Sequence, residues 1–172
     1  MEMTSAEANK LLRKLREEHD TLTRMESENY TFEAATTEDP EDVRPDYDYR
    51  QTQLRLEELE RRICRLKHAV NRFNVTQEVS GTGMTIDQVL VRIPQLSDRK
   101  RRLAKMRTTQ KKTRNYNGRG VCFIDYSYAN FDPAEANRDY LAAADELAAL
   151  QNALDLVNST VRFEADTEEQ AE

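Results

Sequence analysis

The segment Tyr49–Asn74, YRQTQLRLEELERRICRLKHAVNRFN, decides the fold of this chain. From Leu56 onward its apolar residues lie 3, 4, 3, 4 and 3 positions apart, which is the heptad rhythm of a helix with one apolar seam. No Pro or Gly interrupts the segment, so it predicts a helix about 39 Å long. Such a helix cannot bury its seam alone, and another part of the chain or a second copy must cover it. The apolar positions are Tyr49, Leu56, Leu59, Ile63, Leu66, Val70 and Phe73.

The composition suits long, solvated helices. At 172 residues the chain is expected to form a single helical domain, 1–172. Charged residues make up 34% of it and aromatic residues 7%, with four Gly, four Pro and no Trp. No run of about 18 apolar residues is present and the N-terminus has no apolar signal core, so we expect a cytoplasmic protein without a membrane span. Cys64 and Cys122 stand in dissimilar contexts and are interpreted as free thiols.

Two helices are expected in the first half. The first, 4–28, begins at Thr4, which forms a capping box with the glutamate three residues later. An acidic loop, 29–44, follows, in which a Pro could start one turn of helix. The second helix, 45–74, is expected to start at Pro45, with acidic residues on its first turn.

The second half is expected to contain two more helices. Thr85 opens the third, 85–106, through another capping box, and Pro94 should kink or split it. Val121–Phe131, VCFIDYSYANF, is rich in β-branched and aromatic residues and predicts a short strand. Its expected partners are Tyr30–Phe32, Thr76–Val79 or another subunit. The remaining segments are a basic loop with this extended arm (107–131), a last helix (132–164) and an acidic tail (165–172).

The last helix has its own apolar seam, with residues spaced 4, 3, 4, 3, 4, 3 and 4 apart from Ala136 to Val161. This seam favours the central helix as its partner. The similar endings of the two helices also suggest an alternative, in which the first helix pairs with the second and the third with the fourth. We predict an all-α fold of about four helices in long antiparallel, coiled-coil-like hairpins, with one or two short strands. The expected core is Leu56, Leu59, Ile63, Leu66, Leu147, Leu150, Leu154 and Val157.

Arg99–Arg119 carries ten Lys or Arg and no Asp or Glu, although the whole chain has a net charge of −6. With four aromatic residues nearby, it could bind the phosphates and stack on the bases of a nucleic acid or hold another polyanion. One alternative is that it is solvated or pairs with acidic segments, because Glu26–Asp48 contains nine Asp or Glu and one Arg. Another is contact with an anionic membrane surface. The candidate polyanion-binding residues are Arg99, Arg101, Arg102, Lys105, Lys111, Lys112, Arg114 and Arg119.

Four polar residues lie beside the seams of the central and last helices: His68, Asn71, Asn74 and Asn158. The three asparagines are interpreted as caps of helix ends and His68 as a structural or surface residue; alternatively, the four form a polar pocket shared between subunits. The sequence has no metal-ligand spacing, no nucleophile context and no phosphate-binding loop. We therefore expect no catalytic residue, no cofactor and no metal.

Four stretches carry a resemblance to known proteins: LKHAVNRFN (Leu66–Asn74), MTIDQVLVRIPQL (Met84–Leu96), IDYSYANFD (Ile124–Asp132) and ALDLVNSTVRFE (Ala153–Glu164). The chain resembles a group of uncharacterised, mostly bacterial helical proteins that is itself similar to the septicolysin-like family. This resemblance implies a helical, long-hairpin fold that self-associates, and it identifies no catalytic residue. The leading functional hypothesis is a non-enzymatic coiled-coil interaction or structural protein that forms homo-oligomers. Polyanion binding is the alternative, and an enzyme with a site at a subunit interface is a distant third.

Overall fold

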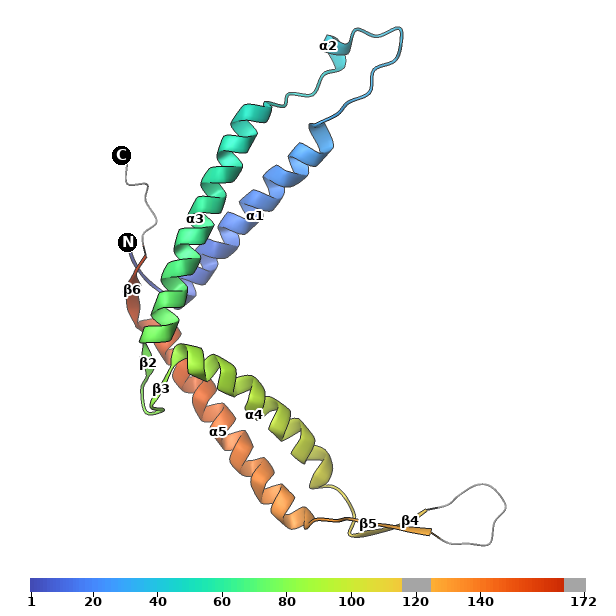
Figure 1. The fold of residues 1–172 in the computed structure, drawn as a ribbon, viewed down its shortest axis with the longest axis vertical. Helices are drawn as coiled ribbons and strands as arrows, with labels where there is room; N and C mark the ends of the chain where they lie inside the picture. Colours follow the sequence, from blue (N-terminus) through green and yellow to red (C-terminus); the bar gives the residue numbers. More distant parts are fainter. Residues whose placement is uncertain (116–124, 166–172) are drawn as a thin grey trace, which may run out of the picture. The chain divides into compact units, whose positions relative to one another are not determined.

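The computed structural model describes residues 1–115 and 125–165, which form five helices and six short strands (Figure 1). The chain divides into two compact units, and the prediction of a mainly helical fold is confirmed. Unit 1 comprises residues 1–74 and the chain from residue 158 onward, and unit 2 comprises residues 75–157.

Unit 1 is built on an antiparallel pair of helices, α1 (Ser5–Asn29) and α3 (Tyr49–Thr76). Near the start of α1, Leu12 lies beside Val70 of α3, whereas near its end Glu26 accepts a hydrogen bond from Gln53 at 2.5 Å. Later residues of α1 therefore contact earlier residues of α3, as they do in an antiparallel pair. A four-residue helix, α2 (Pro40–Val43), lies in the acidic connection, as its Pro predicted.

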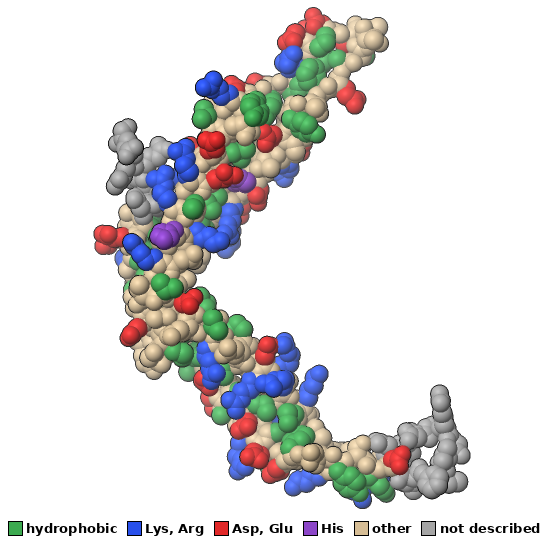
Figure 2. All heavy atoms as spheres, viewed as in Figure 1, with side chains coloured by type: hydrophobic (Ala, Val, Ile, Leu, Met, Phe, Trp, Pro, Cys, Tyr) green, Lys and Arg blue, Asp and Glu red, His purple; other side chains and the backbone are tan. Residues whose placement is uncertain are grey.

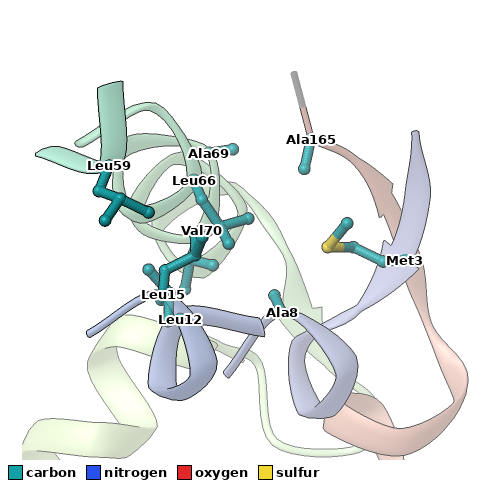
Figure 3. Close-up of a cluster of buried hydrophobic side chains, with 9 residues drawn as sticks. All are labelled: Met3, Ala8, Leu12, Leu15, Leu59, Leu66, Ala69, Val70 and Ala165. Atoms are coloured by element: carbon teal, nitrogen blue, oxygen red, sulfur yellow. The ribbon is translucent and has the colours of Figure 1, made fainter. Parts of the chain in front are cut away.

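The core of unit 1 lies between these two helices (Figure 3). Strand β1 (Glu2–Thr4) pairs antiparallel with β6 (Arg162–Glu164), and the ring of Phe163 stacks on Phe73 at 4.6 Å between centroids. The two ends of the described chain thus close the base of the helix pair. The cluster comprises Met3, Ala8, Leu12, Leu15, Leu59, Leu66, Ala69, Val70 and Ala165.

The predicted capping box at the start of α1 is confirmed. The Thr4 hydroxyl accepts from the Glu7 amide at 3.2 Å, and the Glu7 carboxylate accepts from the Thr4 amide at 2.8 Å. This bond from the Thr4 amide holds the pKa of Glu7 below its ordinary value. Because the folded pKa is lowered, the cap contributes stability above the ordinary carboxyl pKa, and that contribution is lost as the pH falls through the folded pKa.

Unit 2 is a second antiparallel pair, α4 (Ile86–Met106) and α5 (Pro133–Thr160). Arg92 pairs with Glu146 at 2.7 Å and Arg99 with Asp139 at 3.9 Å. The later residue of α4 thus contacts the earlier residue of α5, so the two helices are antiparallel. The predicted capping box at the start of α4 is also confirmed. The buried residues of the pair are Ile86, Val89, Leu96, Ala136, Ala143, Leu147, Leu150, Leu154 and Val157.

Two antiparallel strand pairs complete unit 2. Strand β2 (Glu78–Val79) pairs with β3 (Met84–Thr85), and the turn between them has Gly81 at φ +78° and Gly83 at φ +65°. These left-handed values favour glycine over other residues. Strand β4 (Lys112–Asn115) pairs antiparallel with β5 (Asp125–Tyr128).

Two predicted helix bounds are wrong in detail, and one of the two alternatives predicted at Pro94 does not occur. The central helix starts at Tyr49 rather than at Pro45, because the Asp48 carboxylate caps it by accepting from the Gln51 amide at 2.9 Å. The last helix ends at Thr160, since the residues after it form β6 with the N-terminal strand. Helix α4 runs through Pro94 without a break, so the predicted split does not occur. Pro94 is exposed, and the carbonyl that loses its donor belongs to Leu90, which is also exposed.

The partners predicted for the extended arm and for the central helix are also wrong. The described part of the arm, β5, pairs with Lys112–Asn115, a segment interpreted as a mobile loop. Residues 116–124 lie outside the described part of the chain. The helix that packs on the central helix within its unit is α1 rather than the last helix, in line with the alternative pairing. Of the eight predicted core residues seven are buried, and Ile63 is partly buried.

The seam of α3 gives a direct test of the core assignment. Leu59 is completely buried, whereas Leu54 on the same helix is 58% exposed. We expect Leu59→Ala to lower the free energy of unfolding by about 2–5 kcal/mol, through lost burial and a residual cavity. Leu54→Ala is the matched control and should cost less than about 0.5 kcal/mol. Urea denaturation followed by circular dichroism measures both, and equal losses would contradict the assignment.

Candidate functional site

The predicted basic residues lie at one end of unit 2, on exposed positions. Arg99, Arg101, Arg102 and Lys105 belong to the last two turns of α4. Lys111, Lys112 and Arg114 follow, the last two of them on strand β4. Arg119 lies outside the described residues. The helix end and the hairpin therefore carry seven of the eight candidate residues.

Several of these cations form ion pairs with nearby carboxylates of the same unit. Arg101 pairs with Asp98 one turn earlier on α4. Lys111 lies 3.9 Å from Asp132, which caps α5 by accepting from the Ala134 amide at 3.1 Å. These side chains are about half exposed or more, so each pair contributes at most about 1 kcal/mol.

The acidic segment proposed as their counterpart makes contacts within unit 1. Glu26 accepts hydrogen bonds from Tyr47 at 3.0 Å and from Gln53 at 2.5 Å. Burial, together with the bond to Glu26, raises the pKa of Tyr47. Glu41 binds Arg44 at 2.6 Å, and this bond lowers the pKa of the Glu41 carboxyl. The contacts described for this acidic segment are therefore with residues of unit 1 and not with the basic segment.

The β4–β5 hairpin places a cation against two tyrosines. The Lys112 ammonium lies 4.0 Å from the ring centre of Tyr126 and 5.4 Å from that of Tyr128. The two rings are 6.5 Å apart, and Tyr128 is 66% exposed. Residues two apart in a strand share a face, so the hairpin presents two aromatic rings and a lysine together. Cation–π contact of this kind contributes about 0.5–1 kcal/mol at an exposed site.

A second cation–π contact lies nearby, and the sequence did not reveal it. The Arg107 guanidinium sits 3.9 Å from the ring centre of Tyr140, a residue of the predicted α5 seam. The contact joins the end of α4 to the start of α5. It therefore helps to hold the basic end of α4 against its partner helix.

The four predicted polar residues all fall in unit 1, but the structure does not gather them into one site. His68 and Asn71 are exposed, whereas Asn74 and Asn158 are half-buried. Of the four, Asn71 lines a surface groove of about 330 Å³ between α1 and α3. Its other polar lining residues were not predicted from the sequence; they are Asn9, Arg13, Arg16 and Lys67.

The residues that could serve metal or redox chemistry are dispersed. Among residues 1–115 and 125–165, no group of three or more His, Cys, Asp or Glu is placed to hold a metal ion. The two ring nitrogens of His19 lie 3.4 Å from Glu60 and 3.6 Å from Asp20. Cys64 is a free, exposed thiol, and Cys122 lies outside the described residues. No helix of the described chain has the length and apolar character needed to cross a membrane.

Comparison with known proteins defines this chain by its fold. No protein-family model matches it, and no curated protein is similar to it at a significant level. Its fold is similar to that in a crystal structure of a functionally unknown conserved protein from Corynebacterium diphtheriae, with a TM-score of 0.61. The two are 20% identical, and the match covers 95% of this chain and 100% of the other. At that identity the likeness shows the fold alone, and the resemblance to the septicolysin-like group stays a prediction.

Proposed function

We propose that the chain is a non-enzymatic, self-associating helical protein of the cytoplasm that acts as an interaction or structural element, and that α5 forms its homo-oligomer contact. The observation that supports this proposal is a second apolar surface on α5. The helix already buries one seam against α4, yet small and apolar side chains also lie on its exposed side. A helix that is apolar on more than one face is typical of a helix with more than one partner.

The second surface is a stripe with heptad spacing, Ala142, Ala149 and Leu156. All three residues are exposed, Leu156 at 61%. Each residue turns the helix by about 100°, so Ala149 lies about 100° from the buried Leu150. The stripe is therefore separate from the seam that holds the α4–α5 pair together.

The stripe is self-complementary. In a twofold antiparallel pairing centred on Ala149, that residue meets its own copy, and Leu156 of one chain meets Ala142 of the other. The large side chain then packs over a small one at both ends, while the central alanines allow the two backbones to approach closely. A second copy of this chain thus fits the surface that α5 presents.

One carboxylate beside the stripe, that of Glu146, is already paired within unit 2. Glu146 lies four residues after Ala142 and three before Ala149, so its side chain neighbours both positions on the helix surface. Its carboxylate binds Arg92 twice, at 2.7 and 2.9 Å. An ion pair formed in advance reduces the repulsion between the carboxylates of two approaching copies.

The association through α5 can be tested at the centre of the stripe. We expect Ala149→Arg to convert the oligomer to a monomer, because twofold pairing would bring the two introduced guanidinium groups together. Light scattering after size exclusion measures the mass, and circular dichroism should show unchanged helix content because Ala149 is exposed.

The matched control is Gln151→Arg, which adds the same group to an exposed position on the same helix. Gln151 lies about 200° from Ala149 around the axis and is outside the stripe. It should leave the mass unchanged. A monomeric wild-type protein at high concentration, or equal dissociation of both variants, would refute the proposal.

A second candidate function, polyanion binding at the basic end of unit 2, is favoured by the Lys112, Tyr126 and Tyr128 cluster. A lysine can neutralise a phosphate, and an exposed tyrosine ring can stack on a base at about 1–3 kcal/mol per base. The carboxylates Asp98, Asp132 and Asp139 weigh against it, since each pairs with one of the nearby cations.

Fluorescence anisotropy of a labelled single strand, first RNA and then DNA, tests this candidate. We expect saturable binding that weakens steeply between about 50 and about 200 mM salt. Neutralising four of the basic residues should lower the affinity at least about tenfold. Absence of binding at low salt would refute it. The test variant changes Arg101, Arg102, Lys111 and Lys112 to Gln. A control with the same charge changes Arg24, Arg44, Arg50 and Arg138 to Gln and should bind like the wild type.

A further inference from the structure

Unit 1 carries a basic surface that no single stretch of sequence reveals. The segment Lys10–Arg16 of α1 contains four Lys or Arg, and Arg61–Thr76 of α3 contains five, and neither segment contains Asp or Glu. The antiparallel pairing of the two helices brings these segments side by side. In Figure 2, Lys and Arg side chains gather over the half of this helix pair that holds the start of α1.

A groove of about 330 Å³ lies within this surface. Leu12 and Val70, which belong to the buried core, form its apolar floor. Its polar lining consists of two guanidinium groups, one ammonium group and two amides, with no carboxylate. These polar lining residues are Asn9, Arg13 and Arg16 from α1 and Lys67 and Asn71 from α3.

The cations of the groove are not engaged elsewhere in the described chain. Within residues 1–115 and 125–165, the side chains of Arg13, Arg16 and Lys67 take part in no ion pair or hydrogen bond. By contrast, Arg55 and Arg62 on the same helix pair bind Glu18 and Glu58. The groove therefore concentrates positive charge and hydrogen-bond donors that have no partner within the described structure.

We propose that this groove is a binding site for an oligophosphate, a small anion that carries two or three linked phosphate groups. Guanidinium groups bind phosphate through two parallel hydrogen bonds, and an ammonium group adds a point charge. The two amides supply further donors to the remaining oxygens. The site lies in unit 1, so the proposal does not rest on association through α5.

The spacing of the cations favours linked phosphates over one small anion. Arg13 and Arg16 are three residues apart, which places their Cβ atoms about 5–6 Å from each other on one face of α1. Lys67 stands on the other helix, so the three charges surround the groove rather than a single point. The volume is at the lower limit of ligand-sized sites, about 300–1,000 Å³, and suits a short phosphate chain.

Isothermal titration calorimetry of the full chain with sodium tripolyphosphate tests the proposal. We expect saturable binding with one ligand per chain, weaker binding of orthophosphate, and a marked decrease in affinity between about 50 and about 200 mM salt. The test variant changes Arg13, Arg16 and Lys67 to Gln. Its affinity for tripolyphosphate should fall at least about tenfold, and its helix content should stay unchanged because all three side chains are exposed.

The control changes Arg24, Arg50 and Arg138 to Gln, which removes the same charge outside the groove and should alter the affinity less than about twofold. Absence of saturable binding, or equal losses in both variants, would overturn the site. A single-stranded oligothymidylate of about 12 nucleotides is the second probe. If it binds more tightly than tripolyphosphate and loses that binding in the groove variant, the ligand is a nucleic-acid backbone and the oligophosphate assignment is overturned.

Discussion

The structure depends on one constraint, the burial of a single apolar seam between two antiparallel helices in each unit. A pair of helices has only one internal contact, so the burial depends on seam residues such as Leu59 and Leu66 in unit 1 and Leu147 and Leu150 in unit 2. Every other helix face meets solvent or a partner. In unit 1 the outer faces near the start of α1 carry cations, whereas in unit 2 the outer face of α5 carries the stripe of Ala142, Ala149 and Leu156. The candidate surfaces follow from this architecture.

The seams and caps were predictable because they are local. A heptad pattern identifies which face of a helix is buried, and Leu59 and Leu150 follow from it without knowledge of the partner. The choice of partner was not local, since each of the four long helices carries a similar seam. It depends on the strands that join residues far apart, such as β1 with β6, and on which helices belong to the same compact unit. The start of the central helix depended on which residue caps it, and the cap is Asp48.

The candidate sites also combine features that the local sequence predicts with features that depend on tertiary contacts. The basic segment was evident from composition, but its pairing was not, because the KTRN sequence of β4 has little of the β-branched and aromatic character that marks a strand. Strand β4 forms opposite the aromatic β5, which brings Lys112 against Tyr126. The groove needed a tertiary contact, since Arg13 and Lys67 are 54 positions apart. The absence of carboxylates marks both segments that line the groove, Lys10–Arg16 and Arg61–Thr76, but it does not predict that they lie side by side.

An overall net charge of −6 does not argue against anion binding in such a protein. Charges more than about 8 Å apart in water at physiological salt are largely screened, so a surface responds to its near neighbours. Arg13 and Glu26 are 13 residues apart on α1, a separation of about 20 Å along the helix axis. The acidic end of the α1–α3 pair therefore cannot cancel the field at the groove. The field at the groove therefore depends on the three cations that line it and on carboxylates within about 8 Å, rather than on the net charge of the chain.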